Sequence, residues 1–184
     1  GLNKKSLTYK FFKKFEKFTI LKADIIVTLT HQAKNSIINN FSKITNKKIF
    51  VIPTCGDEKF FKPSKHNRIL NKEIVFGYIG SIDTAYNIEK IISSFSKIIL
   101  QIPNTKLKIL TKNFNHILDH LMQKYRIPPE KYLIKYVSRE KIINEIDSFD
   151  FGIFYLNKNY SSSASFPTKI AEYLLCGKPI ICND

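Results

Sequence analysis

The chain has 184 residues, 43% hydrophobic and 13% aromatic, which is enough for one domain or two small ones and excludes a disordered tail. It carries 30 Lys and Arg against 15 Asp and Glu, so the net charge is 30 − 15 = +15 and an anionic partner is considered first. Only Arg68, Arg126 and Arg139 are arginines, whereas proteins that recognise nucleic acids use arginine heavily. The three cysteines are widely spaced and fit neither a disulfide framework nor a CxxC metal pair, which indicates a reducing compartment.

The first predicted element is a helix over about residues 5–21, with two stripes along it. One stripe is apolar and the other is basic, as in helices that lie on an anionic membrane surface. The same pattern suits a helix that covers a domain outside this chain, and we favour this structural interpretation. The apolar stripe consists of Leu7, Phe11, Phe15 and Phe18, and the basic stripe of Lys10, Lys13 and Lys17.

The next predicted elements are a strand over 24–29, a helix over about 32–41 and a strand over 49–52. A polar, proline-bounded stretch follows over residues 53–71, and its composition is typical of a linker between domains. We therefore expect one domain to end near residue 52 and another to begin near residue 72.

From residue 74 onward, short apolar runs alternate with helical patterns, which predicts an α/β fold with a parallel sheet. Amphipathic helices are predicted over 88–99 and 114–125. Such a sheet has helices on both faces, yet the chain stops directly after a strand, so we expect it to be a piece of a longer protein. The predicted strands cover residues 74–79, 106–111, 132–136, 150–156 and 179–182.

The segment FPTKIAEYLLCGKPIICND is the most informative motif. A Ser-rich loop leads into Pro167, which suits an early helix position, and Gly177 ends the helix before a strand. The free N–H groups at such a helix start suit a phosphate. Lys169 in the first turn is either solvated or adds a cation to this anion site, while Glu172, one turn further on, could accept hydrogen bonds from sugar hydroxyls. The spacing alone leaves a ligand site and a merely packed helix equally open.

The segment GYIGSIDTAYN lies between a predicted strand and a predicted helix, where it reaches the same crevice. It lacks the G-x-G-x-x-G dinucleotide pattern, and a tight turn with Asn87 as helix N-cap is the favoured interpretation. His116 and His120 lie four residues apart on the next helix, but opposite its apolar face, so we expect them in solvent. The sequence therefore predicts no metal site and no cofactor.

Four segments in chain order resemble the group 1, or family 4, glycosyltransferases, whose GT-B fold has two Rossmann-like domains facing each other across a cleft. This resemblance assigns residues 1–52 to the end of the N-terminal Rossmann-like domain and 53–71 to the interdomain linker. Residues 72–184 become the C-terminal nucleotide-sugar-binding domain, a parallel sheet with helices on both faces that is incomplete at its C-terminus. The segments are ADIIVTLT, VIPTCGDEKFFKP, IVFGYIGSIDTAYNIEKIISSF and SFPTKIAEYLLCGKPIICND.

The resemblance implies a bacterial hexosyltransferase that moves a sugar from a nucleotide-diphosphate donor to a cell-surface glycan or a lipid-linked acceptor. In that family the transfer needs no metal and retains the anomeric configuration. The implied location is cytoplasmic, at the inner face of the cytoplasmic membrane, with an anionic membrane surface as a partner and no nucleic acid. The competing hypothesis, based on the net charge, is a nonenzymatic basic module that binds polyanions or membranes.

By position, Glu172 matches a family glutamate that holds the ribose hydroxyls, and the N–H groups around Thr168 and Lys169 would face the diphosphate. The whole donor-binding set implied by the resemblance is Gly80, Ser81, Tyr86, Ser165, Pro167, Thr168, Lys169 and Glu172. Its catalytic residues would lie in an N-terminal domain outside this chain, so we expect the chain alone to be inactive.

Three positions depart from the family pattern. Ser81 and Tyr86 stand where members often carry Arg and Lys, and Ala164 stands where the first glutamate of an E-x7-E pair is usual. Loss of both cations weakens stabilisation of the leaving diphosphate. Lys169 or basic groups from elsewhere then compensate, or the donor differs, or the activity is low.

Overall fold

The computed structural model describes residues 3–41, 44, 47–63, 73–82, 86–112, 116–157 and 159–183. The chain forms two compact units. The first unit comprises residues 1–54 and 159–166, and the second comprises residues 55–158 and 167–184. The predicted domain limits at residues 52 and 72 stay a prediction, because residues 64–72 lie outside the described part of the chain.

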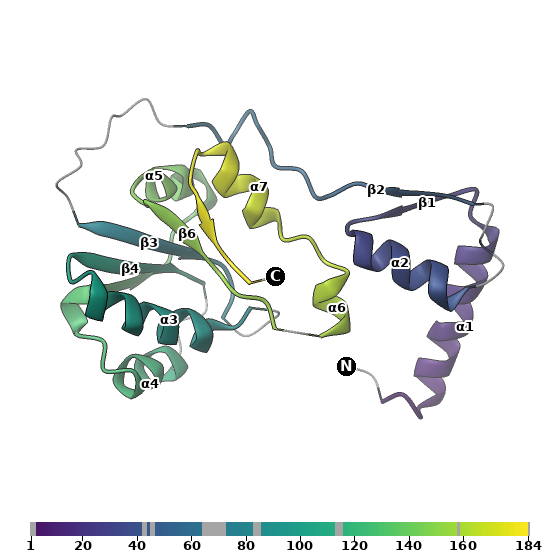
Figure 1. Cartoon of the computed structure of the whole chain (residues 1–184), viewed down its shortest axis with the longest axis horizontal. Helices are drawn as coiled ribbons and strands as arrows, with labels where there is room; N and C mark the ends of the chain where they lie inside the picture. The colour runs from purple at the N-terminus through teal and green to yellow at the C-terminus, as the bar shows by residue number, and fades with distance from the viewer. Residues whose placement is uncertain are drawn as a thin grey trace. The chain divides into compact units, whose positions relative to one another are not determined.

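The first unit contains α1 (Leu7–Lys22), β1 (Ile25–Thr28), α2 (His31–Asn40), β2 (Lys48–Val51) and the short α6 (Tyr160–Ser163). The two strands pair in parallel, as expected for strands joined through a helix (Figure 1). The first four elements lie within two residues of their predicted bounds. Periodicity and caps therefore suffice to predict this part of the fold.

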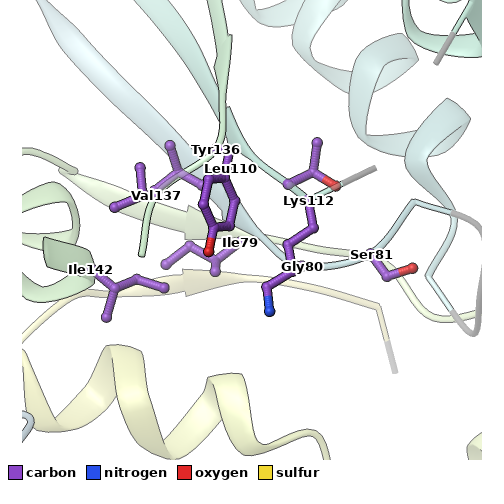
Figure 2. Close-up of a pocket in the computed structure, with 9 residues that line it drawn as sticks. Ile79, Gly80, Ser81, Leu110, Lys112, Tyr136, Val137 and Ile142 are labelled. Carbon is purple, nitrogen blue, oxygen red and sulfur yellow. The ribbon is translucent and has the colours of Figure 1, made fainter. Parts of the chain in front are cut away.

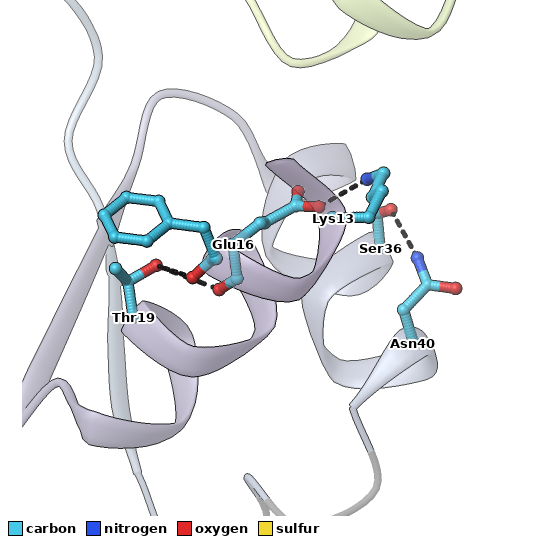
Figure 3. A network of polar contacts seen from close by, with 6 residues as sticks. Lys13, Glu16, Thr19, Ser36 and Asn40 are labelled. Carbon is cyan, nitrogen blue, oxygen red and sulfur yellow. Dashed lines mark hydrogen bonds and ion pairs between the residues drawn. The ribbon is translucent and has the colours of Figure 1, made fainter. Parts of the chain in front are cut away.

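Local hydrogen bonds hold the two helices of the first unit. The Ser6 side chain accepts from the Tyr9 N–H at the start of α1, and the Thr30 side chain accepts from the Ala33 N–H at the start of α2. Figure 3 shows the Lys13–Glu16 ion pair on α1, at 2.5 Å, among further contacts on the two helices. None of the residues of α1 or α2 is buried. Local contacts thus define these helices, while the buried apolar residues of this unit, Ile26 and Ile44, lie outside them.

The Ser-rich segment before Pro167 was predicted as a loop, and that prediction is wrong, because one turn of helix forms there as α6. The Asn159 side chain accepts from the Ser162 N–H at 2.8 Å, and the Ser162 hydroxyl accepts from the Asn159 N–H at 3.0 Å. This reciprocal capping box satisfies two N–H groups that a loop would leave to water.

The second unit is built on a parallel five-stranded sheet in the order β5-β4-β3-β6-β7 (Figure 1). All five predicted strands are present, and β3 has the predicted bounds. The prediction for β6 is too long, because after Ile153 the chain leaves the ladder and Leu156 instead forms an antiparallel bridge with Tyr86. The strands are β3 (Ile74–Ile79), β4 (Thr105–Leu110), β5 (Tyr132–Lys135), β6 (Phe151–Ile153) and β7 (Ile180–Ile181).

Helices cover both faces of this sheet, as predicted. The helices α3 (Ile88–Gln101) and α4 (His116–Lys124) lie on one face, and α5 (Ile142–Asp147) and α7 (Thr168–Leu175) lie on the other (Figure 1). The predicted start of α4 at residue 114 lies outside the described residues. The short α5 was not predicted, because six residues are too few to show a helical period.

The core of the second unit lies between this sheet and its helices. Its largest fully buried side chains are Tyr78, Phe95, Phe149, Phe154 and Tyr173. Burying each such side chain stabilises the fold by about 1.5–3 kcal/mol. Within the described residues, no helix is both long and apolar enough to cross a lipid bilayer.

Candidate functional site

The site lies at the carboxyl ends of β3 and β6, where the strand order reverses direction. The chain runs from β3 outward to β4 and β5, and then returns to place β6 and β7 on the other side of β3. Open α/β sheets bind ligands at such a switch point. The loops that follow the two strands meet here, since Asn87 N–H donates to the Tyr155 carbonyl at 2.8 Å. Asn87 is also the predicted N-cap of α3, and its side chain accepts from Lys90 N–H at 2.9 Å.

The N-terminus of α7 points its first N–H groups at this crevice without a side-chain cap. Pro167 is the N-cap residue rather than the early helical residue that we predicted, and it has no side-chain donor or acceptor to offer. Within the described chain, the Thr168 and Lys169 N–H groups have no hydrogen-bond acceptor. The helix end therefore keeps its positive dipole and its donors for a ligand.

The C-terminus of α7 is closed by a Schellman motif, which confirms the predicted role of Gly177. Its φ of 68° is one that glycine adopts without strain, and its N–H donates to the Leu174 carbonyl at 2.9 Å. The Tyr173 hydroxyl accepts from the Ile79 N–H at 3.1 Å and donates to the Gly77 carbonyl at 3.3 Å. These bonds fasten α7 to β3 and so set where its first turn lies.

Lys169 is the central side chain of the site, because only 9% of it is exposed. Its Nζ lies 3.6 Å from the centroid of the Tyr86 ring and 5.8 Å from that of Tyr78. In the described part of the chain it donates no hydrogen bond and has no carboxylate within 4 Å. Burial lowers the pKa of Lys169 to about 8, although the nearby Glu172 carboxylate raises it. The interpretation of Lys169 as a solvated residue is therefore wrong.

Glu172 is half-buried one turn along α7. Burial raises the pKa of this carboxyl group, while the charges of Lys169 and Arg139 lower it. Burial also raises the pKa of Tyr86, and the Glu172 charge adds to that rise. Arg139 is thus a second cation near the site, and its guanidinium lies 5.6 Å from the centroid of the Phe60 ring. No sequence motif predicts Arg139 at the site, because it lies outside the segments that carry the other site residues.

Gly80 is required where the loop leaves β3. Its φ of 145° lies in a region that side chains rarely adopt, and a Cβ atom here would lie 2.6 Å from Lys169 Nζ. The next residue, Ser81, accepts a hydrogen bond from the Tyr78 hydroxyl through its carbonyl at 2.6 Å. Gly80 therefore gives the Lys169 side chain the space it occupies.

A pocket of about 290 Å³ opens beside Gly80, at the carboxyl ends of β3, β4 and β5 (Figure 2). Only two of its residues were predicted as site residues, although the others lie at the ends of predicted strands or in the segments that follow them, which is a usable signal. Apart from Lys112 and the hydroxyls at its rim, the lining is largely apolar. The lining residues are Ile79, Gly80, Ser81, Leu110, Thr111, Lys112, Tyr136, Val137 and Ile142, of which Gly80 and Ser81 were predicted.

The structure brings most of the predicted site residues together, namely Gly80, Ser81, Tyr86, Lys169 and Glu172. Thr168 is exposed at the first position of α7. Ser165 belongs to the first compact unit, where its hydroxyl donates to the Ser161 carbonyl at 2.7 Å. Whether these residues bind a donor stays a prediction.

His116 and His120 are both exposed on α4, as predicted. No group of three His, Cys, Asp or Glu side chains among the described residues is arranged to hold a metal ion.

The strand order, the capless helix start and the pocket define a Rossmann-like unit of the GT-B type. Residues 59–184, more than half of the chain, match the family described as "Glycosyl transferases group 1". The chain belongs to this family. A comparison with curated protein sequences finds no match.

Solved structures of glycosyltransferases share this fold. A structure of a TarM point mutant from S. aureus, in complex with fondaparinux, α-GlcNAc-glycerol and UDP, matches with a TM-score of 0.69 and 14% identity over 94% of this chain and 32% of that chain. Sucrose-phosphate synthase from Thermosynechococcus elongatus has a TM-score of 0.68 and 17% identity over 97% of this chain and 46% of that one. The lipopolysaccharide outer core galactosyltransferase WaaB, in its apo form, has a TM-score of 0.64 and 14% identity over 87% and 43%. The chain thus spans from about a third to less than half of these proteins.

Proposed function

We propose that this chain is the donor-binding part of a glycosyltransferase that moves a hexose from a nucleotide-diphosphate sugar to a cell-surface glycan or lipid-linked acceptor. The observation that carries the proposal is the largely buried Lys169 side chain, whose ammonium has neither a hydrogen bond nor an ion pair within the described chain. Membership of the group 1 family supports the reaction class. The bound UDP and α-GlcNAc-glycerol in the TarM structure support a nucleotide donor and a sugar-containing ligand.

The geometry suits the departure of a nucleoside diphosphate. As the bond to the sugar breaks, negative charge develops on the diphosphate, and a fixed cation beside a helix N-terminus stabilises that charge. Lys169 and the first N–H groups of α7 supply both. The Glu172 carboxylate then accepts hydrogen bonds from ribose hydroxyls, and the apolar pocket beside Gly80 takes the flat nucleobase.

We further propose that the transfer uses no metal and retains the anomeric configuration. The charge that a divalent ion would otherwise neutralise is met by Lys169 and the α7 N-terminus. In the complete protein, EDTA should leave turnover unchanged, and NMR of the product should show the donor's anomeric configuration. Loss of turnover in EDTA or an inverted product would contradict this part of the proposal.

Donor binding is tested by titrating the chain with UDP, GDP and CMP in a calorimeter. We expect one of them to bind, and Glu172→Gln to weaken that binding about 10- to 100-fold, because a charged hydrogen-bond acceptor is lost. Glu130→Gln is the matched control, since Glu130 is exposed just before the amino end of β5. If no nucleotide binds, while nucleic acid or anionic vesicles bind with a steep salt dependence, the chain is a polyanion-binding module instead.

We also propose that α1 holds the protein on the inner face of the cytoplasmic membrane. Phe11 and Phe15 are 65% and 57% exposed, and the lysines beside them complement anionic lipid. Phe11→Ser with Phe15→Ser should abolish sedimentation with phosphatidylglycerol vesicles, whereas Leu100→Ser, at an 83% exposed position of the second unit, should not. If both variants sediment equally, α1 is not the element that binds the membrane.

A further inference from the structure

The described residues of the loop after β3, at positions 80–82 and 86, include no basic side chain. Positions 81 and 86 hold a serine and a tyrosine, and neither side chain carries a positive charge. The Lys169 ammonium nevertheless lies at this loop, 3.6 Å from the centroid of the Tyr86 ring. At this distance the negative face of the ring attracts the ammonium directly.

The Tyr86 ring is itself held from several sides. Its backbone pairs with Leu156 in an antiparallel bridge. Its ring meets Phe154 edge-on, with centroids 6.2 Å apart and planes at 89°, and meets Tyr78 at 6.0 Å and 71°. A ring packed in this way offers a fixed face rather than a mobile one.

Gly80 leaves room for the end of the Lys169 side chain. Gly80 has no side chain, and a Cβ there would lie 2.6 Å from Nζ and 2.8 Å from Cε of Lys169. The end of the lysine side chain therefore lies close to both a glycine and an aromatic face. These two neighbours fix where its charge lies.

The Lys169 side chain is largely buried, and within the described chain its ammonium donates no hydrogen bond to protein. No carboxylate in the described chain lies within 4 Å of Lys169 Nζ, and burial lowers the pKa of Lys169 to about 8. The ring offsets part of this cost, and an incoming anion offsets more. The ammonium is therefore available to an anion that binds beside the Tyr86 ring.

We infer that Tyr86 is a positioning residue, whose ring holds the Lys169 ammonium where a donor diphosphate binds, so that Lys169 supplies the charge that positions 81 and 86 lack. This inference rests on the proposed function, because the anion is taken to be the donor's diphosphate. Tyr86 acts through Lys169, which is the residue that touches the phosphate.

The first test follows Lys169 itself, by NMR titration of the labelled lysine Cε in the full chain without nucleotide. We expect the native midpoint near pH 8, because burial lowers the pKa of Lys169 to about 8. Tyr86→Phe keeps the aromatic face and should leave the midpoint unchanged, whereas Tyr86→Leu keeps apolar bulk without the face and should lower it, because the charged form loses its attraction. An unchanged midpoint in Tyr86→Leu would overturn the inference.

The other titratable groups near Lys169 should contribute equally to its pKa in the compared proteins. Burial raises the pKa values of Tyr78 and Tyr173 above the ordinary value for tyrosine, so both stay neutral through the titration. Glu172, and Arg139 through Glu172, act equally in native protein and variants. The difference between the Phe and Leu variants therefore reports the aromatic face alone.

The second test measures UDP binding by the same proteins at pH 7. Tyr86→Phe should bind within twofold of native, and Tyr86→Leu about 3- to 30-fold more weakly, the range expected for one buried cation–π contact. If the Lys169 midpoint moves but UDP affinity does not, the ring holds the lysine without serving the diphosphate, and the inference fails. If the native protein binds no nucleotide while the midpoint still depends on Tyr86, it is the proposed function that fails, and the inference about the donor falls with it.

Discussion

The two compact units use the same local chemistry but differ in what they bury. In the first unit, β1 and β2 form a parallel pair with one open apolar face: Ile25 is 55% exposed and Val27 56%, whereas Ile26 between them is buried. In the second unit, the parallel strands β3 and β4 place Tyr78 and Leu107 at 0% exposure. Parallel strands are usually covered on both faces, and only the second unit achieves this within the described chain.

This difference shows where stability and binding chemistry reside. Caps, turns and ladder hydrogen bonds are present in both units, so local structure alone does not distinguish them. A layered core supports precise placement of a costly group such as the buried Lys169, because surrounding side chains leave it no alternative position. We therefore expect the two units to respond very differently to matched substitutions.

The largest contrast should come from removing a phenylalanine. Phe95 is 0% exposed in the second unit, and Phe95→Ala should lower the free energy of unfolding by about 3–5 kcal/mol. Phe15 is 57% exposed on α1, and Phe15→Ala should change it by less than about 0.5 kcal/mol. Urea denaturation followed by circular dichroism measures both. If both variants lose a similar free energy of unfolding, α1 packs against another part of the protein in solution, and the two units do not differ in this way.

A second contrast concerns the buried cation. Lys169→Met should raise the free energy of unfolding at pH 7 by about 1–3 kcal/mol, because it removes a charge that burial disfavours. Lys97→Met, at an exposed position of α3, should change it by less than about 0.5 kcal/mol. The same Lys169→Met substitution should weaken UDP binding, so stability and binding move in opposite directions.

The difference in stability between the native protein and Lys169→Met should change with pH in a defined direction. The pKa of Lys169 is about 8 in the folded chain and about 10.4 in an unfolded one, so the unfolded state binds more protons between these values. The stability of the native protein should therefore gain on that of Lys169→Met as the pH rises from about 8 to about 10. Urea titrations of both proteins across this range test it. Parallel pH profiles would mean that Lys169 is solvated.

The smallest contrast concerns helix caps. Asn87 caps α3 over the core of the second unit, and Asn87→Ala should cost about 1 kcal/mol of global stability. Ser6 caps α1, which has no buried residue, so Ser6→Ala should speed amide exchange within α1 and leave global unfolding unchanged. Hydrogen exchange read by mass spectrometry separates these outcomes. Global destabilisation by Ser6→Ala would show that α1 unfolds together with the rest.

Much of the fold follows from local sequence patterns. The alternation that predicts β3, the Asn87 cap of α3 and the Gly177 stop of α7 each depend on a few adjacent residues, and each prediction is confirmed. The sequence-based predictions fail where contacts with residues distant in the sequence determine the structure. Leu156 leaves the β6 ladder because Tyr86, seventy positions earlier, pairs with it.

The candidate site divides in the same way. That an anion-suited helix start carries Lys169, with Glu172 one turn on, is visible in the segment FPTKIAEYLLCGKPIICND, because helix geometry links positions three residues apart. The sequence by itself therefore determined the class of fold, the family and the helix that bears the site.

Only the tertiary structure decided the state of that lysine. Its burial, its place over the Tyr86 ring, the space left by Gly80 and the pocket beside it all depend on strands and loops that meet only when the sheet forms. A charge at the start of a helix is solvated or buried according to what packs on it, and such packing partners lie far away along the chain.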